Sequence, residues 1–212
     1  MNTLSDYRTQ GRSRLADRWN EAAMLTFVYL LIAGAGSTCL SGLDLIARGA
    51  GSACYILLLP LSWSYSVAFL DNHQGASNDP FNIERLFDGY RQGQFFRIFT
   101  TMLLTTVYTL LWTLQLIIPG IIKALSYALT PYILRDNPQL SGNQAIELSM
   151  HMMKGHKWQL FCLCLSFLGW FLLCLCTLFI GVFWLQPYVQ STLASFYEDR
   201  RTGYEQEGCY QK

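Results

Sequence analysis

The feature that most constrains this chain is an almost uncharged stretch at residues 98–134, in which Lys123 is the only charged side chain. The stretch is longer than the roughly 17 to 25 residues with which a helix crosses a bilayer once. Pro119 and Gly120 interrupt it near its middle. This pattern predicts a transmembrane hairpin with a tight turn at residues 118–121, where glycine tolerates backbone geometry that other residues do not.

The composition extends this prediction from one hairpin to the whole chain. Hydrophobic residues make up 52% of the 212 residues and charged residues only 14%, whereas soluble domains carry about 25% charged residues. The apolar residues occur in long blocks, which favours a bilayer over a soluble core. The net charge of +1 gives no general attraction to nucleic acid.

We therefore expect an all-α integral membrane protein with about six transmembrane helices. The first apolar run is expected to be an uncleaved span, because the polar segment before it is long and includes acidic residues, unlike a signal peptide. The expected single membrane domain, residues 1–212, divides into a leader helix at 1–21, spans one and two at 22–70, a loop with an amphipathic helix at 71–97, spans three and four at 98–134, a second amphipathic helix at 135–157, spans five and six at 158–196, and a cytoplasmic tail at 197–212.

The same order of elements recurs three times, which predicts pseudo-repeats of one amphipathic helix followed by one hairpin. Gly93 and Gly155 each stand three residues before an aromatic residue that opens a span. Proline and glycine are expected to form the turns and kinks of the hairpins, because proline breaks helices and glycine permits close turns. The residues expected in these roles are Pro60, Pro119, Gly120, Pro131, Gly181 and Pro187.

Three polar segments are expected to form amphipathic helices on the membrane surface, because their apolar residues recur at helical spacing. Arg8 interrupts the apolar face of the first. The third begins with a capping box at Ser141–Gln144, and its methionine-rich side suits a partner protein or the membrane surface equally well. The apolar faces consist of Leu4, Tyr7, Gly11, Leu15 and Trp19; of Ile83, Leu86, Phe87 and Tyr90; and of Ile146, Leu148, Met150, Met152 and Met153.

The positive residues predict the orientation of the chain. Of the 15 Lys and Arg residues, only Arg48 and Lys123 fall outside the side that holds both termini. Because loops rich in Lys and Arg stay in the cytoplasm, both termini are expected to be cytoplasmic, in the inner membrane of a bacterium. The residues expected at the level of the lipid headgroups are Trp19, Arg85, Tyr90, Lys154, Lys157 and Trp158.

No pattern predicts a catalytic, cofactor-binding or metal site. The seven Cys residues are odd in number and lie mostly in apolar blocks, which indicates small apolar side chains rather than disulfides. His151 and His156 point about 140° apart around a helix and do not chelate one metal ion. The single ionisable side chain in the spans, Lys123, is expected near the outer turn, so proton-coupled transport is not expected.

Three functions remain open from the sequence. A scaffold or partner protein in a membrane complex is expected first, because no transport or catalytic signature is present. A carrier or exporter of a neutral or lipid-like compound is the alternative, since helices broken by proline can line a binding site. An intramembrane enzyme is expected least, because no ionisable cluster or nucleophile–base pair is recognisable. The expected partners are membrane lipids and a protein partner or second copy of the chain, with no nucleic acid and no cofactor.

Most of the chain, and most specifically residues 86–199, resembles a family of bacterial integral membrane proteins known only as a domain of unknown function. The resemblance rests on PGIIKALSY at 119–127, TPYILRDNP at 130–138, MMKGHKW at 152–158 and LSFLGW at 165–170, followed by the Pro-Tyr at 187–188 and the Phe-Tyr at 196–197. It implies a multi-pass protein of the cytoplasmic membrane. It implies no activity and no site residues. The membrane portion of some glycerophosphodiester phosphodiesterases is distantly similar, but no catalytic domain of that kind is recognisable here.

Overall fold

The structure is a computed structural model of the 212-residue chain. It describes residues 3–16, 18–38, 58–75, 81–91, 94–176 and 181–206. The expected connection between spans one and two, the start of span two and the last residues of the tail lie outside the described residues. Every regular element within these ranges is helical, in agreement with the expected fold class.

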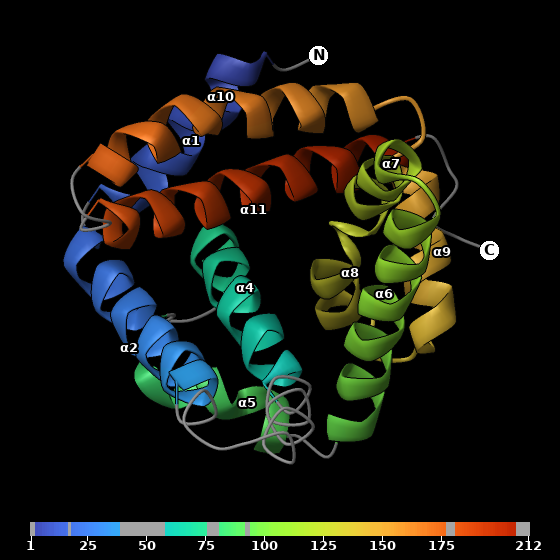
Figure 1. The fold of residues 1–212 in the computed structure, drawn as a ribbon, viewed down its shortest axis with the longest axis horizontal. Helices are drawn as coiled ribbons and strands as arrows, with labels where there is room; N and C mark the ends of the chain where they lie inside the picture. Colours follow the sequence, from blue (N-terminus) through green and yellow to red (C-terminus); the bar gives the residue numbers. More distant parts are fainter. Residues whose placement is uncertain are drawn as a thin grey trace.

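Helices follow one another along nearly the whole described chain (Figure 1). In chain order they are α1 (Leu4–Leu15), α2 (Trp19–Thr38), α4 (Leu59–Gln74), the 3₁₀ helix η1 (Ile83–Phe87), α5 (Asp88–Arg91), α6 (Phe95–Gln115), α7 (Ile117–Tyr127), α8 (Thr130–Asp136), α9 (Gly142–Met152), α10 (Lys157–Cys176) and α11 (Val182–Gln206).

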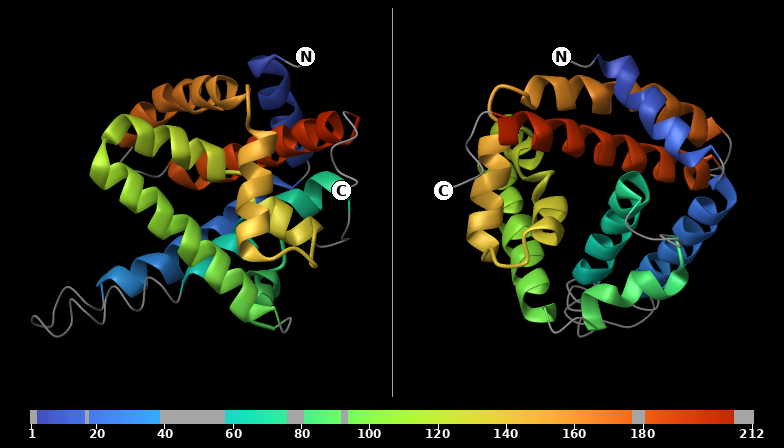
Figure 2. Two further views of the ribbon diagram at one scale, coloured as in Figure 1. Left: turned by 90° about the vertical axis from the view of Figure 1, so that its right-hand side faces the viewer. Right: turned by 180° about the vertical axis from the view of Figure 1, so that it is seen from behind.

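The helix α11 connects most of the other elements. It packs against α1, α2, α4, α9 and α10, and Figure 1 shows it running across above α4, with α2 on one side and α6 to α9 on the other. Seen from behind in Figure 2, α1 lies against the pair α10 and α11. The largest fully buried side chains of this core are Tyr7, Tyr65, Phe69, Tyr132, Phe196 and Tyr197.

Two helical stretches are long and apolar enough to cross a membrane, Phe95–Gln115 and Lys157–Cys174. Only 17% and 22% of these stretches, respectively, are buried inside the protein. Helices that are apolar on all sides and remain exposed are suited to a nonpolar surrounding. The stretch Trp19–Gly34 is apolar but shorter, so the described part of the chain contains two candidate spans of full length rather than the predicted six.

The central hairpin reverses at Leu116, earlier than the sequence predicts. Leu116 has an extended backbone (φ −162°, ψ 135°) between α6 and α7, and these two helices pack against each other. Pro119 and Gly120 lie in the first turn of α7, where proline removes no helical hydrogen bond. The predicted turn at residues 118–121 is therefore wrong, because the extended residue before α7 already redirects the chain.

Two other prolines begin helices rather than bend them. Pro60 lies in the first turn of α4 and Pro131 in the first turn of α8. The predicted fourth span is consequently divided, since α7 ends at Tyr127 and α8 begins at Thr130. Pro187 behaves as predicted in one respect, because it lies inside a helix, α11.

The helix α11 is longer than the predicted sixth span. Gly181 directly precedes it, and the Gly181 carbonyl accepts hydrogen bonds from the backbone N–H groups of Trp184 and Leu185. The helix then runs to Gln206, whereas the sequence predicts that the helix ends at residue 196 and a polar tail follows. Tyr197 is fully buried. Residues 197–206 stay helical because their polar side chains find partners on α1, α4 and α8.

The segments predicted to lie on a membrane surface pack residues of their apolar faces against other helices of the protein. Tyr7 and Leu15 of α1 are fully buried, as is Leu86 of η1. Ser141 forms the predicted capping box at the start of α9, and Met152 on the same helix is buried. The helical spacing thus identified the apolar faces, but α1 packs on α11, η1 on α4, and α9 on α6 to α8.

Gly120 allows the close approach of α6 and α7. A Cβ atom at this position would lie 2.6 Å from Cα and 2.9 Å from the backbone nitrogen of Thr113. We expect Gly120→Ala to lower the free energy of unfolding by about 1–3 kcal/mol, the usual cost of overpacking. Chemical denaturation in mixed micelles measures this difference.

Gly169→Ala on α10 is the matched control, because a Cβ atom there has no neighbour within 4 Å. It is expected to leave stability unchanged or to raise it by about 0.5–1 kcal/mol, as alanine does in open helical positions. Equal effects of the two substitutions would show that Gly120 is not required for the packing of the hairpin.

Candidate functional site

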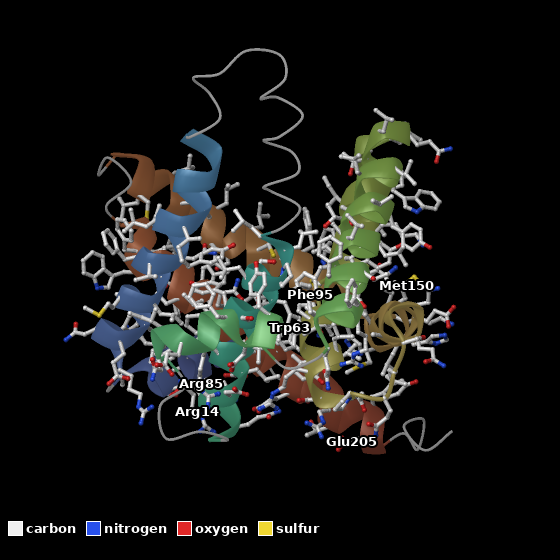
Figure 3. The ribbon with its side chains drawn as sticks, turned by 90° about the horizontal axis from the view of Figure 1, so that it is seen from below. Arg14, Trp63, Arg85, Phe95, Met150 and Glu205 are labelled. Carbon is white, nitrogen blue, oxygen red and sulfur yellow. The ribbon has the colours of Figure 1, made fainter. Side chains whose placement is uncertain are left out.

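Charged side chains gather at one end of the molecule. Figure 3 shows nitrogen and oxygen atoms concentrated around Arg14, Arg85 and Glu205, while α2 and α6 extend away from this end with mainly carbon side chains. We call this region the polar end. Its interacting side chains come from α4, η1, α8 and α11 and are Asp71, His73, Arg85, Arg135, Asp136, Glu198 and Arg201.

Two buried aspartates organise the polar end. Asp71 of α4 forms ion pairs with Arg85 of η1, at 2.9 Å, and with Arg135 of α8. Asp136 of α8 pairs with Arg135 at 2.8 Å and with Arg201 of α11 at 2.7 Å. Each of the two carboxylates is shared by two guanidinium groups, which offsets part of the cost of burying it.

Burial dominates the titration of Asp71. It raises the pKa of this carboxyl group, although Arg135 and Arg85 act in the opposite direction. A carboxylate desolvated to this degree is disfavoured in its charged form. The two arginines offset part of this cost, and their ion pairs with Asp71 hold the end of α4 against η1 and α8.

A second buried chain of hydrogen bonds joins α4 to α11. His73 Nδ1 lies 2.5 Å from Glu198 Oε2, and His73 Nε2 lies 2.6 Å from Ser195 Oγ. The residue types are those of a serine–histidine–carboxylate triad. Ser195, however, is 1% exposed, and its hydroxyl donates to the carbonyl of Ser191 at 3.0 Å.

These hydrogen bonds indicate a structural connection between α4 and α11 and do not indicate that Ser195 is a nucleophile. The Ser195 proton is directed to the Ser191 carbonyl, so the Ser195 oxygen accepts the hydrogen bond from the Nε2–H group of His73. In that arrangement His73 does not accept the proton of the Ser195 hydroxyl, as a general base would. The serine oxygen is also closed to a substrate by its burial. These hydrogen bonds hold the end of α4 against α11.

A third polar contact attaches α1 to α11. The Tyr7 hydroxyl donates to Asp199 Oδ2 at 2.5 Å, and Arg200 pairs with the same oxygen. Burial, followed by the hydrogen bond to Asp199, raises the pKa of Tyr7 to about 12. Burial alone would raise the pKa of Asp199, but the hydrogen bonds from Tyr7 and Arg200 lower it overall.

Away from this polar contact, a cavity opens between α1, α10, α11 and the start of α2. Its volume of about 460 Å³ falls within the roughly 300–1,000 Å³ of small-molecule sites. We call it the α1 cleft. Two arginines of α1 and tryptophans of three other helices contribute to its lining: Arg8, Arg12, Trp19, Trp170 and Trp184.

Arg8 is the central polar group of the α1 cleft. Its Nη1 donates to Ser166 Oγ at 2.9 Å, and its Nε lies 3.4 Å from the Tyr188 hydroxyl. The guanidinium carbon lies 5.7 Å from the centre of the Phe167 ring. Ser166 is near the midpoint of α10, a candidate span, so Arg8 brings a positive charge against an apolar helix.

The structure places the residues predicted at the headgroup level in two groups. Lys154 and Trp158 are exposed, and Lys157 is partly exposed. Arg85 is instead paired with Asp71, and Trp19 lines the α1 cleft. Tyr90 packs against the rings of Phe87 and Phe95.

The sequence reasoning missed the residues that form both sites. Arg8 was available as a signal, because it is the one charge on the otherwise apolar face of the leader helix. The cluster around Asp71 and Asp136 had no signal at all, since its members are scattered along the chain. The contact between His73 and Ser195 was also missed, because the two residues are separated by 122 positions in the chain.

Metal binding receives no support from these groups. Within the residues that the structure describes, no three His, Cys, Asp or Glu side chains are arranged to hold a metal ion. The carboxylates of the polar end already accept bonds from arginines. The chemistry that the described site offers is the recognition of a negative charge beside an aromatic surface.

Comparison with known proteins gives one match. A family model described as a protein of unknown function (DUF975) matches residues 113–202. The matched region contains α7 to α10, most of α11 and the end of α6, but it does not include α1. No curated protein and no solved structure matches the chain. The match is consistent with an uncharacterised family and assigns no activity.

Asp136 provides a test of the polar end. Its side chain is 3% exposed, whereas Arg135 and Arg201 are 23% and 34% exposed. We expect Asp136→Asn to lower the free energy of unfolding by about 2–4 kcal/mol, because it removes the buried carboxylate that Arg135, Arg201 and Tyr197 share; the loss stays below that of a fully buried pair, because the arginines are partly solvated and each keeps one other carboxylate.

Glu205→Gln is the control for Asp136→Asn in the same denaturation experiment. Glu205 pairs with Arg201 one helical turn away, at 2.9 Å and with 42% exposure. Its loss is expected to change stability by about 0.5 kcal/mol or less. A loss at Asp136 no larger than this would contradict the role of the polar end.

The contact of Tyr7 with Asp199 makes stability depend on pH. The pKa of Asp199 is lowered in the folded state, so its contribution is present above the unfolded value of about 3.9 and disappears as the pH falls through the folded value. We expect Asp199→Asn to weaken the dependence of the melting temperature on pH in the acid range. Tyr7→Phe should weaken it in the same direction; an unchanged acid dependence in both variants would contradict the assignment.

Proposed function

We propose that this protein is an integral protein of a bacterial inner membrane that carries or exports a lipid-like compound, with the α1 cleft as the binding site. The cleft is the observation that supports the proposal. It combines cationic and aromatic side chains in a cavity of the size of a ligand site. Such a combination recognises a molecule with one polar end and one apolar end.

Exposed apolar side chains support the membrane environment. Leu110 and Leu114 of α6, Ile118 of α7, and Leu172 and Leu173 of α10 are each more than half exposed. An apolar surface of this extent is typical of contact with lipid or with another protein. Lipid is the simpler surrounding for two helices that are long enough to span a bilayer.

We further propose the arrangement expected from the sequence: six spans in three pseudo-repeats, with the polar end and both termini in the cytoplasm. The concentration of arginines at the polar end supports this orientation, because Lys and Arg are retained on the cytoplasmic side of membranes. The exposure of Lys154 and Trp158 next to α10 suits contact with lipid headgroups.

A scaffold within a membrane complex is the second candidate. The tip of the α6–α7 hairpin favours it, because Leu116 and Ile118 are 65% and 74% exposed and α6 extends away from the polar end (Figure 3). Lipid alone covers an apolar tip inside a bilayer, however, whereas the arginines of the α1 cleft call for a polar ligand. The carrier is therefore the better supported proposal.

Native mass spectrometry of the gently extracted protein distinguishes the two candidates. We expect a retained lipid-like molecule and no stoichiometric protein partner. Leu173→Trp adds bulk to the lining of the α1 cleft and is expected to remove the bound molecule. Leu165→Trp is the matched control, because Leu165 lies on the same helix, has similar exposure (54% against 59%) and does not line the cleft.

The outcome decides between the proposals. Retention of the molecule by Leu165→Trp and its loss in Leu173→Trp would support a carrier that uses the α1 cleft. A stoichiometric protein partner in the absence of any bound small molecule would overturn the carrier and favour the scaffold.

A further inference from the structure

We propose that the α1 cleft binds an anionic lipid, with the phosphate of the headgroup held by Arg8 and Arg12 and the acyl chains on the tryptophans. This inference rests on the proposed function and names the chemistry of its ligand. It also replaces the neutral compound expected from the sequence with a negatively charged one, because the sequence did not show that Arg8 lies in a cavity.

The charge of the cleft is the first argument. Arg8 contacts the neutral groups Ser166, Tyr188 and Phe167. In the described part of the chain, no carboxylate lies within ion-pair distance of Arg8 or Arg12. The polar end, by contrast, gives each of its arginines a carboxylate. Two uncompensated cations that line one cavity indicate an anionic ligand.

The position of Arg8 strengthens this argument. Its Nη1 reaches Ser166, near the midpoint of a helix long enough to span a membrane. A positive charge beside an apolar helix is unfavourable unless a counter-charge or polar ligand accompanies it. A phosphate satisfies the planar guanidinium with two parallel hydrogen bonds, which a lipid without an anionic group does not provide.

A hydroxyl group next to Arg8 completes a site for phosphate. Tyr188 lines the cleft, and its hydroxyl lies 3.4 Å from Arg8 Nε. Because it accepts from Arg8, its own proton can be donated to a ligand oxygen. A phosphate between the arginines would thus meet charged donors from α1 and a neutral donor from α11.

The apolar lining identifies the ligand as a lipid rather than a free anion. Trp170 and Trp184 are 50% and 53% exposed, so the cleft continues into the exposed apolar surface of α10 and α11. Leu173 extends this surface along α10. Acyl chains can pack on the tryptophan rings and leave the cleft over these side chains into the surrounding bilayer.

The packing of α1 keeps the arginines in the cleft. The Ser191 hydroxyl donates to the carbonyl of Gly11 at 2.9 Å, and a Cβ atom at Gly11 would lie 2.7 Å from Thr192 Oγ1. These contacts hold the side of α1 that contains Tyr7 against α11. Arg8 follows Tyr7 and is therefore directed toward α10, about 100° around the helix.

The experiment is a binding titration of the full chain in neutral detergent, followed by tryptophan fluorescence. Phosphatidylglycerol is the anionic lipid, diacylglycerol the lipid without a phosphate, and glycerol phosphate the headgroup without acyl chains. We expect phosphatidylglycerol to bind at least about tenfold more tightly than the other two, the factor associated with one charge-assisted hydrogen bond.

Arg8→Gln is expected to weaken phosphatidylglycerol binding by at least about tenfold and to leave diacylglycerol binding unchanged. Arg14→Gln is the matched control, because Arg14 is an exposed arginine of the same helix, removes the same charge and does not line the cleft. Arg12→Gln replaces an exposed side chain and serves as the second cleft variant if Arg8→Gln does not fold.

Each result has one meaning. Equal binding of the two lipids, or equal effects of the cleft and control variants, would overturn the anionic lipid and leave the lipid carrier intact. Glycerol phosphate binding as tightly as phosphatidylglycerol would identify a free-anion site and overturn the lipid ligand. Binding of none of the three would contradict both this inference and the proposed function.

Discussion

The buried carboxylate of Asp136 connects the elements on which the rest of the structure depends. It accepts hydrogen bonds from Arg135 on its own helix, from Arg201 on α11 and from the Tyr197 hydroxyl at 2.9 Å. A charge buried to this extent is stable only while its partners stay in place. The last turns of α11 are therefore held against α8, and α11 in turn packs against five other helices.

The polar end and the α1 cleft are linked through α11. Tyr7 attaches the beginning of α1 to Asp199 near one end of α11, and Gly11 brings the middle of α1 onto Ser191 and Thr192. This alignment sets the rotation of α1 about its axis. Arg8 is thereby placed between α10 and α11, where a positive charge would be unfavourable without a ligand. The interactions that stabilise the fold thus also position the candidate ligand-binding side chain.

The sequence predicted the type of most elements but not what their faces contact. Helical spacing identified the apolar side of α1, and the Ser-x-x-Gln motif identified the capping box of α9. These patterns did not show that the buried residues of both helices pack on other parts of the protein, because an apolar helical face has the same pattern whether it meets lipid or protein. The prolines were also misinterpreted. Pro60 and Pro131 were expected to kink helices, but they lie at helix starts, because proline is well tolerated in the first turn of a helix.

What the sequence by itself determined is the all-helical, highly apolar character of the chain, since long runs with few charges leave helix as the conformation that satisfies the backbone in a nonpolar surrounding. Only the tertiary structure decided which charges meet. Asp71 and Arg135 are 64 residues apart, His73 and Glu198 125, and Arg8 and Ser166 158. Partners at such separations follow from how the helices pack, and no local pattern encodes that packing. The α1 cleft is therefore a property of the assembled fold.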